Sequence, residues 1–314
     1  MNNFFEIIRE GINTTFQDIG RNNLNHIGIP TSGAMDNRNY RLANSIVGNV
    51  YGSPVVEFAY QGPLLKYKGE KIKIVVTGDV FFKIKKKYNE FEGNCYETYI
   101  LENNDEIDII STNKSVYGYL AISGIIDLSL QWNSCSINTK ANIGSNNGKK
   151  LVKNQKIKIQ KINDDLRPLK LDYLNTRIEK IRVIKGTNFN FFSEKGKKIF
   201  FEKEFNVTKL SDRMGMRLEG ENIENIFEEN IRSEGLVKGI IQVPSDGNPI
   251  IMLSDHGTIG GYPKIATVIS ADFDKLAQLP PGSKIKFQSI ELKDAETLFK
   301  LYEMDTQNLI SQIK

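Results

Sequence analysis

The amino-acid sequence predicts a mainly β protein with a few helices, built as two β-barrel domains in tandem. Its 314 residues suffice for two domains that each bury a core. Short runs of β-branched and aromatic residues, separated by turn signals, make up most of the chain. No proline occurs between Pro63 and Pro168, which suits a sheet region that needs every backbone N–H. Many short strands without crossover helices favour barrels, because closure hides the strand edges.

The elements follow from these patterns in chain order. The predicted strands are residues 71–78, 81–85, 97–101, 106–110, 115–122, 180–185, 197–201, 205–208, 239–243 and 250–253. Helices are predicted over residues 36–47, after Ser270, and from residue 292 to about 302. Asp36 is expected to cap the first helix, because a side-chain oxygen accepts from first-turn N–H groups. The polar segment 163–177 is predicted as a linker between an N-terminal domain (1–165) and a C-terminal domain (166–314).

Composition excludes several classes of protein. The net charge of +4 is spread over interleaved lysines and acids, so no nucleic-acid partner is expected, and the basic run 83–87 is predicted as the solvated face of a strand. Two cysteines, Cys95 and Cys135, are too few for a disulfide scaffold or a zinc site, and two histidines make a metal site improbable. No apolar stretch approaches the ~20 residues of a membrane span. We expect a cytoplasmic protein with no metal site and no membrane association.

Two segments concentrate the residue types that build sites. Residues 28–36 (GIPTSGAMD) and 253–264 (LSDHGTIGGYPK) each combine glycines, a proline, hydroxyls and a carboxylate, and His26 and His256 lie beside or within them. Such mixtures occur where backbone approaches a ligand closely and polar groups converge on it. We expect both to be loops that border one pocket. Turns at separate surfaces are the alternative.

Arginine use points to anion handling. Only ten of the 42 basic residues are arginines, and six of these fall in or beside the glycine- and carboxylate-rich segments: Arg21, Arg38, Arg41, Arg213, Arg217 and Arg232. A guanidinium offers a planar fork for carboxylate or phosphate, which an ammonium does not. For any single arginine, a structural ion pair with a nearby aspartate is an equal alternative.

Several ordered motifs resemble a known family. They are residues 15–21 (TFQDIGR), 28–36 (GIPTSGAMD), 41–44 (RLAN), 77–79 (TGD), 121–125 (AISGI), 211–220 (SDRMGMRLEG), 241–249 (IQVPSDGNP) and 260–268 (GGYPKIATV). On these motifs the chain resembles the allophanate-hydrolase-subunit-2-like family, also called the biotin-dependent carboxyltransferase or KipA family. The resemblance implies two cyclophilin-like barrels, a partner subunit of related fold and work in a multi-subunit amide-processing enzyme.

Two branches of that family are relevant. One is the C subunit of the ATP-dependent 5-oxoprolinase, which SDRMG and GGYPKI resemble; the other is the carboxyltransferase part of urea carboxylase. The first implies hydrolysis of the lactam of 5-oxo-L-proline to L-glutamate with A-like and B-like partner proteins of the 5-oxoprolinase, the chain alone being inactive. The second implies transfer of a carboxyl group from carboxybiotin to urea or a related amide. A non-catalytic binding or regulatory module is a third possibility. The segment 255–259 (DHGTI) departs from the Asp-x-Gln-Thr-Thr of the first branch, which leaves the exact substrate open.

The resemblance and the residue chemistry together suggest site residues. ATP with Mg²⁺, held by the complex, is expected to activate the lactam oxygen, and biotin enters only in the second branch. We expect Asp36, Arg213 and Asp255 to be catalytic: a carboxylate orients water and a guanidinium holds an anion. Substrate or phosphate binding is expected from Ser32, Gly33, Ala34, Arg217, Gly260, Gly261, Tyr262 and Lys264.

Purely structural roles are the alternatives to these assignments. Asp36 is expected first as a helix cap, Asp212 can close a turn, and His256 can be a loop residue without a role. Glu57, in an apolar stretch, is expected to be the buried partner of an arginine, and a solvated strand residue is the alternative.

Overall fold

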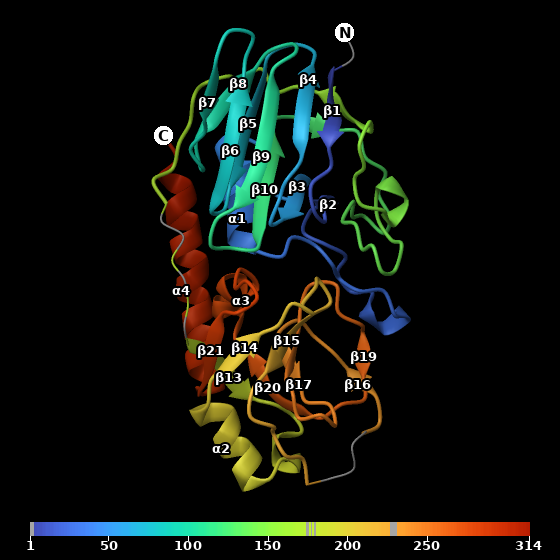
Figure 1. The fold of residues 1–314 in the computed structure, drawn as a ribbon, viewed down its shortest axis with the longest axis vertical. Coiled ribbons are helices and arrows are strands. Elements are labelled where there is room, and N and C mark those ends of the chain that lie inside the picture. Colours follow the sequence, from blue (N-terminus) through green and yellow to red (C-terminus); the bar gives the residue numbers. More distant parts are fainter. Residues whose placement is uncertain (1–2, 174–175, 177, 179, 227–230) are drawn as a thin grey trace. The chain divides into compact units, whose positions relative to one another are not determined.

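The computed structural model describes residues 3–173, 176, 178, 180–226 and 231–314. They form two compact units (Figure 1). Unit 1 comprises residues 1–21, 32–175 and 306–314, and unit 2 comprises residues 22–31 and 176–305. Each unit combines separated parts of the chain, whereas the predicted domains were continuous. Of the predicted linker, residues 174, 175 and 177 lie outside the described residues.

Unit 1 consists of two antiparallel sheets and one helix. Its strands are β1 Asn3–Arg9, β2 Thr15–Gln17, β3 Val55–Ala59, β4 Leu64–Lys68, β5 Ile72–Thr77, β6 Val80–Lys85, β7 Glu90–Glu92, β8 Thr98–Leu101, β9 Glu106–Thr112, β10 Tyr117–Ile122, β11 Ile125–Ile126 and β12 Lys156–Lys161. The sheet orders are β11-β12-β1-β4-β9-β6-β7 and β2-β3-β10-β5-β8. Helix α1 (Asn37–Val47) packs on β3, β5 and β10, and η2 (Asn146–Gly148) is a single 3-10 turn.

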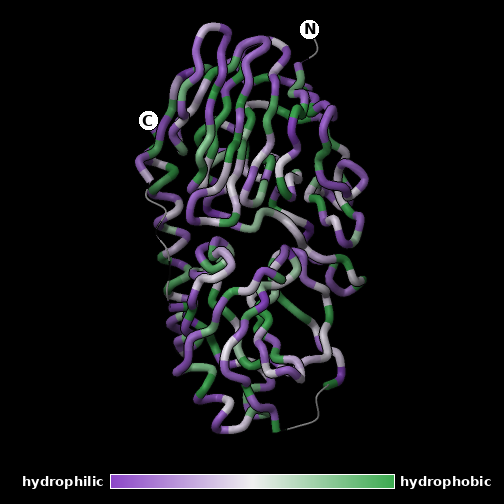
Figure 2. The backbone as a smooth tube through the Cα atoms, in the orientation of Figure 1, coloured by the Kyte–Doolittle hydropathy of each residue, from purple (hydrophilic) through white to green (hydrophobic). Residues whose placement is uncertain are grey.

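The two sheets share one hydrophobic core. Phe5 and Leu65 of the first sheet belong to the same buried cluster as Phe58 and Val76 of the second. Strands β3, β5 and β10 are buried along their whole length, because α1 covers the face that does not meet the other sheet. Strands β4 and β6 of the first sheet instead alternate buried with more exposed residues, as one solvated face requires. Figure 2 shows the corresponding hydrophobic stretches along the strands.

Unit 2 contains a closed barrel. Its elements are η1 Asn25–Ile27, β13 Lys180–Lys185, η3 Phe189–Phe191, α2 Glu194–Glu202, β14 Phe205–Val207, β15 Gly215–Glu219, β16 Glu234–Gly235, β17 Ile240–Gln242, β18 Ile250–Met252, β19 Ile259–Gly260, β20 Lys264–Val268, α3 Ser270–Ala277 and β21 Lys284–Ser289. The barrel order is β13-β20-β17-β18-β15-β14-β21, and β21 closes it by pairing in parallel with β13. Strands β16 and β19 form a separate two-stranded sheet. Helix α4 (Leu292–Ser311) follows, and its residues from Thr306 count with unit 1.

The mainly β prediction with few helices is confirmed. Helix α1 begins after Asp36, whose side chain accepts from the Asn39 N–H, and ends at Gly48 in the left-handed conformation. Strand β13 has the predicted bounds, and α3 and α4 lie where helices were expected.

The predicted strand 197–201 is wrong, because this stretch lies within α2. Ser193 caps the helix by accepting from the Gly196 N–H. Gly196, Ile199 and Phe200 are its buried residues, a helical spacing that overrides the β propensity of the Ile-Phe-Phe run. Phe200 stacks on Phe287 of β21 at 4.4 Å between ring centroids.

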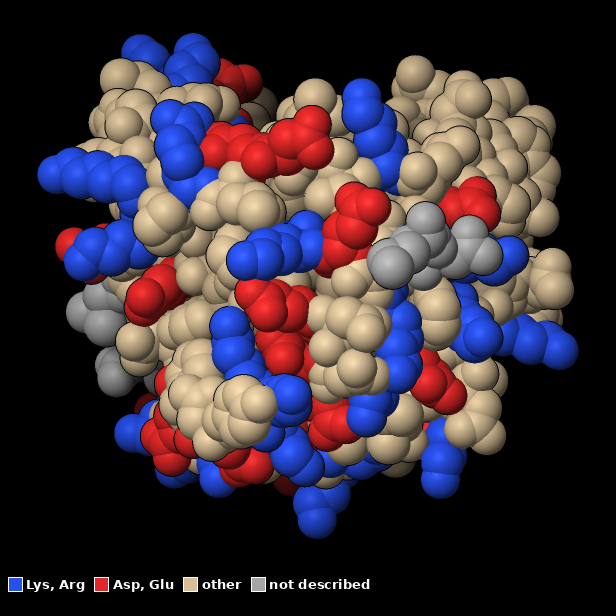
Figure 3. Space-filling view, turned by 90° about the horizontal axis from the view of Figure 1, so that it is seen from above, with Lys and Arg blue, Asp and Glu red and all other residues tan. Residues whose placement is uncertain are grey.

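Charged side chains of both signs are interspersed on the face drawn in Figure 3. The first sheet of unit 1 carries such pairs, among them Lys66 with Glu106 at 2.9 Å and Lys83 with Glu90 at 3.5 Å. Lys83 and Lys85 of the basic run 83–87 lie on β6 at half-buried and exposed positions, as predicted, whereas Lys86 and Lys87 follow the strand. Among the described helices, none is long and apolar enough to cross a membrane.

A buried carboxylate fixes the loops at one end of unit 1. Asp18, 5% exposed, directly follows β2. It accepts hydrogen bonds from the Ser134 and Ser136 hydroxyls, both at 2.6 Å, and from the backbone N–H groups of Gly20 (2.8 Å) and Cys135 (2.7 Å). Four donors satisfy this one carboxylate, so its removal leaves all four without their acceptor in the protein interior.

We therefore expect Asp18→Ala to lower the free energy of unfolding of unit 1 by at least about 3 kcal/mol, since several buried donors lose their acceptor. The chain's single tryptophan, Trp132, lies in the loop that Asp18 anchors, so its fluorescence during urea denaturation reports on this unit. The matched control is Asp164→Ala at an exposed position, which should change stability by less than about 0.5 kcal/mol. Equal midpoints for the two variants would contradict the assignment.

Candidate functional site

The predicted segment 28–36 is divided between the units, with residues 28–31 in unit 2 and Ser32 onward in unit 1. Ser32 and Gly33 both adopt left-handed backbone, with φ of 56° and 85°. A Cβ on Gly33 would meet the backbone N of Gly20 at 3.0 Å, so this close approach requires glycine. The Ala34 N–H donates to the Asp18 carbonyl at 3.0 Å, which holds the segment against the loop after β2.

Protein acceptors already engage the N–H groups before α1. Met35 donates to Glu57 Oε2 at 2.8 Å and Asp36 donates to the Tyr119 hydroxyl at 2.7 Å. Glu57 is buried and accepts from the Met35 N–H, and its predicted pairing with an arginine stays a prediction. Burial, first of all, and the nearby Glu57 and Asp36 charges raise the pKa of Tyr119, which therefore stays protonated. The anion-binding role of Ser32, Gly33 and Ala34 stays a prediction.

Asp36 is a helix cap. Its Oδ1 accepts from the Asn39 N–H at 2.9 Å and its Oδ2 accepts from Asn39 Nδ2 at 2.6 Å, and its side chain is buried. Asn39 is fixed in turn by the Tyr96 hydroxyl, which donates to its Oδ1 at 2.7 Å. This network explains the position of Asp36 without substrate, and a catalytic role for it stays a prediction.

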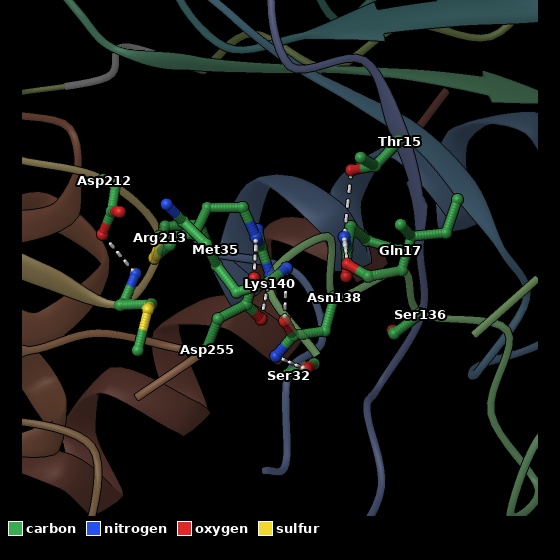
Figure 4. Close-up of polar contacts among 12 residues, drawn as sticks. Thr15, Gln17, Ser32, Met35, Ser136, Asn138, Lys140, Asp212, Arg213 and Asp255 are labelled. Atoms are coloured by element: carbon green, nitrogen blue, oxygen red, sulfur yellow. Dashed lines mark hydrogen bonds and ion pairs between the residues drawn. The ribbon is translucent and has the colours of Figure 1, made fainter. Parts of the chain in front are cut away.

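The structure adds a polar cluster that sequence reasoning did not identify. Gln17, at the end of β2, donates to the Ile137 carbonyl at 2.9 Å, and the next residue, Asn138, donates to Ser32 Oγ at 3.3 Å (Figure 4). All three polar side chains, those of Gln17, Ser32 and Asn138, are buried. Gln17 was visible in the sequence only as part of TFQDIGR, and Asn138 carried no motif signal.

In unit 2 the structure joins two of the predicted catalytic residues. Arg213 Nε donates to Asp255 Oδ2 at 2.8 Å and its Nη2 donates to Oδ1 at 3.0 Å, a bidentate pair (Figure 4). The Asp255 N–H also donates to the Arg213 carbonyl at 2.9 Å. The side chains of Arg213 and Asp255 are 10% and 3% exposed, so the pair is largely shielded from water. Asp212 closes the adjoining turn by accepting from Met214 and Gly215, which confirms its predicted structural role.

The glycine-rich segment of unit 2 is organised around Gln242 of β17. A Cβ on Gly260 would lie 2.7 Å from Gln242 Nε2, which donates to the Tyr262 carbonyl at 3.1 Å. Lys264 is buried, and its ammonium donates to Glu234 Oε2 at 2.9 Å.

Two further predicted residues of unit 2 have exposed side chains. Tyr262 is 40% exposed, and Arg217 projects from the outer face of β15 between buried Met216 and Leu218. The ligand contacts expected of Gly260, Gly261, Tyr262, Lys264 and Arg217 stay predictions, as does the expectation of a pocket shared with residues 28–36.

The six selected arginines differ in their surroundings. Arg21 is 1% exposed and donates to the carbonyls of Gln131 and Ser136, at 3.2 and 2.5 Å, so it ties a loop in place. Arg38 on α1 donates to Thr306 Oγ1 at 3.0 Å. Arg217 and Arg232 are exposed. Arg213 makes the bidentate pair with Asp255.

His256 is a buried neutral histidine. It follows Asp255 and is 3% exposed. Its Nδ1 lies 2.7 Å from the Gly257 carbonyl, and because a carbonyl only accepts, Nδ1 carries the proton. Burial lowers the pKa of His256 below its usual value of 6.5, so the ring is neutral at pH 7.

With this geometry established, the comparison with known proteins identifies the family. Residues 27–289 match the carboxyltransferase domain, subdomain A and B. The chain belongs to this family. The match covers the motifs around Ser32, Arg213 and Asp255.

Within the carboxyltransferase-domain family, three similar proteins stand out. The chain is 31% identical over 291 residues to the C subunit of the Haemophilus influenzae 5-oxoprolinase, covering 92% of each chain. It is 30% identical over 295 residues to the C subunit of the Escherichia coli 5-oxoprolinase, again covering 92% of each. The crystal structure of K. lactis urea amidolyase superposes on 98% of this chain with a TM-score of 0.89 at 27% identity, and the chain spans 20% of that larger protein.

The neutral state of His256 makes stability depend on pH. Because its pKa is depressed in the folded state, the unfolded chain binds more protons below about pH 6.5, so stability present above that pH is lost as the pH falls. We expect His256→Gln to lessen the loss of stability between pH 7.5 and 5.5, by no more than about 1.4 kcal/mol per pH unit. Urea denaturation followed by circular dichroism measures this. The matched control is His26→Gln at the other, exposed histidine, and it should follow the wild-type pH profile.

Proposed function

We propose that the chain is a subunit of an ATP-dependent 5-oxoprolinase complex that opens the lactam ring of 5-oxo-L-proline to give L-glutamate. The observation that carries this proposal is the match along 92% of both chains to two proteins that are each named as the C subunit of a 5-oxoprolinase. The same name supports partner subunits, for which we propose A-like and B-like proteins. A reaction that consumes ATP also fits the expected cytoplasmic location.

The proposed reaction needs an activated amide and an oriented water. ATP, with Mg²⁺, is a co-substrate held within the complex; transfer of its terminal phosphoryl group to the lactam oxygen releases ADP and weakens the amide. Water then adds to the ring carbon, and the C–N bond breaks as the nitrogen takes up a proton to become the amine of glutamate. The acyl phosphate that remains is hydrolysed by a second water to L-glutamate and inorganic phosphate. The residues of this chain contribute by binding the lactam and by orienting the water.

We assign the orientation of water to Asp255. Its two oxygens are held by Arg213 at 2.8 and 3.0 Å, so the carboxylate has one fixed orientation and a shielded position. The sequence suggested that Arg213 would grip a substrate anion, but two of its N–H groups grip Asp255. Arg213 is therefore a positioning residue that acts through Asp255.

The alternative function is carboxyl transfer. The superposition on urea amidolyase over 98% of this chain favours it, because the whole fold is shared. In that case the substrates are carboxybiotin on another protein and urea or a related amide. A non-catalytic binding module is the second alternative.

Reconstitution separates these functions. We expect the purified chain alone to be inactive and ATP-dependent release of glutamate from 5-oxo-L-proline to appear only when A-like and B-like proteins are added. The measurement is glutamate and ADP formation with each component omitted in turn. Turnover by the single chain would refute the proposal, biotin- and urea-dependent activity would establish carboxyl transfer, and binding without turnover would establish the binding module.

The Arg213–Asp255 pair gives a second prediction. Arg213→Lys should lower kcat by about 100-fold with little change in KM, because an ammonium cannot hold both carboxylate oxygens. If Arg213 acts through Asp255, then Arg213→Lys adds little to the loss caused by Asp255→Asn in the double variant. Steady-state kinetics of the reconstituted complex measure both effects.

Unit 2 offers a matched control for this pair. Arg182 on β13 makes a bidentate pair with Asp272 at the start of α3, donating from Nε to Oδ2 at 3.0 Å and from Nη2 to Oδ1. Arg182→Lys should affect stability and leave kcat unchanged. Full activity of the Arg213→Lys variant, or additive losses in the double variant, would overturn the positioning role.

A further inference from the structure

We propose that residues 128–161 of unit 1 dock an acidic face of a partner protein through exposed lysines and the ring of Trp132. The identity of that partner as an A-like or B-like protein rests on the proposed function. Residues 128–161, called here the lysine lobe, comprise the loops that follow β11 and strand β12. The loops are drawn in green beside the sheets in Figure 1, and the whole lobe belongs to unit 1.

The lysine lobe is strongly basic. Lysines and acids are interleaved over most of the chain, but residues 128–161 contain seven lysines and no aspartate, glutamate or arginine. All seven lysines are exposed. A surface with charges of one sign attracts a partner surface of the opposite sign and repels others, so it favours an acidic partner.

Most of these lysines are unpaired within the described part of the chain. Elsewhere on unit 1 lysines pair with acids, as Lys66 does with Glu106 at 2.9 Å. Two acids border the lobe, Glu6 and Asp127, and neither forms an ion pair with a lysine of the lobe. The lysines without an ion-pair partner among the described residues are Lys149, Lys150, Lys153, Lys156, Lys158 and Lys161. Their charge is therefore available to another molecule.

Apolar side chains lie among these charges. Leu130, Trp132 and Val152 are 63%, 50% and 49% exposed. Tryptophan is strongly enriched among the few residues that dominate the binding energy of protein interfaces. A half-exposed indole ring within a basic surface therefore supplies the apolar anchor that charge alone does not.

The turn that presents Trp132 is fixed. Gln131 and Ser134 exchange backbone hydrogen bonds at 2.9 and 3.2 Å, so Trp132 and Asn133 are the central residues of a tight turn. Both have positive φ, 51° and 60°, as in a type I′ turn, which is unfavourable for a bulky residue. The Ser134 hydroxyl donates to buried Asp18 at 2.6 Å and ties the turn to the interior. A side chain on a fixed turn loses less freedom when a partner binds.

Hydrogen bonds join this turn to the lysines. Gln131 Oε1 accepts from the Gly144 N–H at 2.7 Å. Asn146, two residues further on, donates from Nδ2 to the carbonyls of residues 149 and 150 at 2.8 and 3.2 Å. Its Oδ1 accepts from Gln155 Nε2 at 2.8 Å, directly before β12. The tryptophan turn, the lysines that follow it and strand β12 are thus parts of one connected lobe.

The shape and composition of the lobe favour a protein over other acidic partners. A depression of about 380 Å³ is lined by Phe4, Lys156, Lys158 and Asp127, among others, and Lys156 Nζ lies 4.6 Å from the centroid of the Phe4 ring. A protruding acidic side chain can enter this depression, whereas the flat surface of a bilayer cannot. Arginine is the preferred residue for the phosphates of nucleic acids, and the lobe has none.

The test measures binding of the purified full chain to the A-like and B-like proteins by calorimetry. We expect the combined changes Lys149→Glu, Lys150→Glu and Lys153→Glu to weaken binding about 30-fold or more at low salt, because three attractive charges become repulsive. Trp132→Ala should weaken binding by about 30-fold, as loss of a central anchor does. Added salt should weaken binding of the wild type more than binding of the triple variant.

Matched controls lie on unit 1 outside the lobe. The combined changes Lys71→Glu, Lys85→Glu and Lys87→Glu alter the charge equally at three exposed lysines. Tyr88→Ala removes another exposed aromatic ring. Both controls should keep the wild-type affinity within about threefold, because charges and rings away from an interface contribute little to it. Circular dichroism checks the fold of each variant.

Unchanged binding of either lobe variant, equal losses in the lobe and control variants, or no binding of either partner protein overturns the docking surface. Duplex DNA and phosphatidylglycerol vesicles are tested in parallel. Lysine-dependent binding of one of these, without binding of either protein, assigns the lobe to a nucleic acid or a membrane and also overturns it. Partner binding that depends on the lobe without ATP-dependent turnover supports docking and refutes the 5-oxoprolinase function. ATP-dependent turnover together with unchanged binding of the lobe variants does the reverse.

Discussion

The carboxylate of Asp18 is the constraint on which the polar cluster of unit 1 depends. It joins the end of β2 to residues 134–136 through three hydrogen bonds and accepts a fourth from the Gly20 N–H, and the backbone carbonyl of the same residue holds Ala34. Three stretches of chain that are distant in sequence are thereby fixed by one residue. The positions of Gln17, directly before Asp18, and of Ser32, two residues before Ala34, follow from it. A buried carboxylate is tolerable here because protein donors satisfy its oxygens. The same hydrogen bonds hold the residues of the cluster in place.

The two units fix their buried charges differently. Unit 1 surrounds Asp18 with backbone N–H groups and hydroxyls, whereas unit 2 pairs the buried Asp255 with Arg213 and the buried Lys264 with Glu234, which is 45% exposed. Loss of one partner from a buried ion pair leaves an uncompensated charge, so these pairs determine geometry more than they add stability. Several groups that seemed in the sequence to be free for a ligand are used in this way, including the N–H of Met35 and the fork of Arg213. The atoms left over for binding are therefore fewer and more specific than composition suggests.

The parts of the fold that the sequence predicted are those fixed by local chemistry. Helix α1 was predictable because its cap, its apolar face and its terminal glycine are all neighbours in sequence. Strand β13 was predictable because a short run of β-branched residues forms it. Helix α2 was missed because the Ile-Phe-Phe run has high β propensity, and the cap at Ser193 was outweighed. In the site, Arg213 and Asp255 were identified one by one from their motifs. Their pairing depends on a contact between residues 42 apart in sequence, which no local pattern encodes.

Gln17 shows why the rest of a site escapes sequence reasoning. A glutamine at the end of a strand is unremarkable by type, and its significance comes from which of its two amide atoms the fold satisfies. Ile137 and Thr15 engage the nitrogen, and no described residue donates to the oxygen. Which atoms of a side chain the fold satisfies is set by contacts between residues that are distant in sequence, such as that of Gln17 with Ile137. Residue type alone therefore does not predict it.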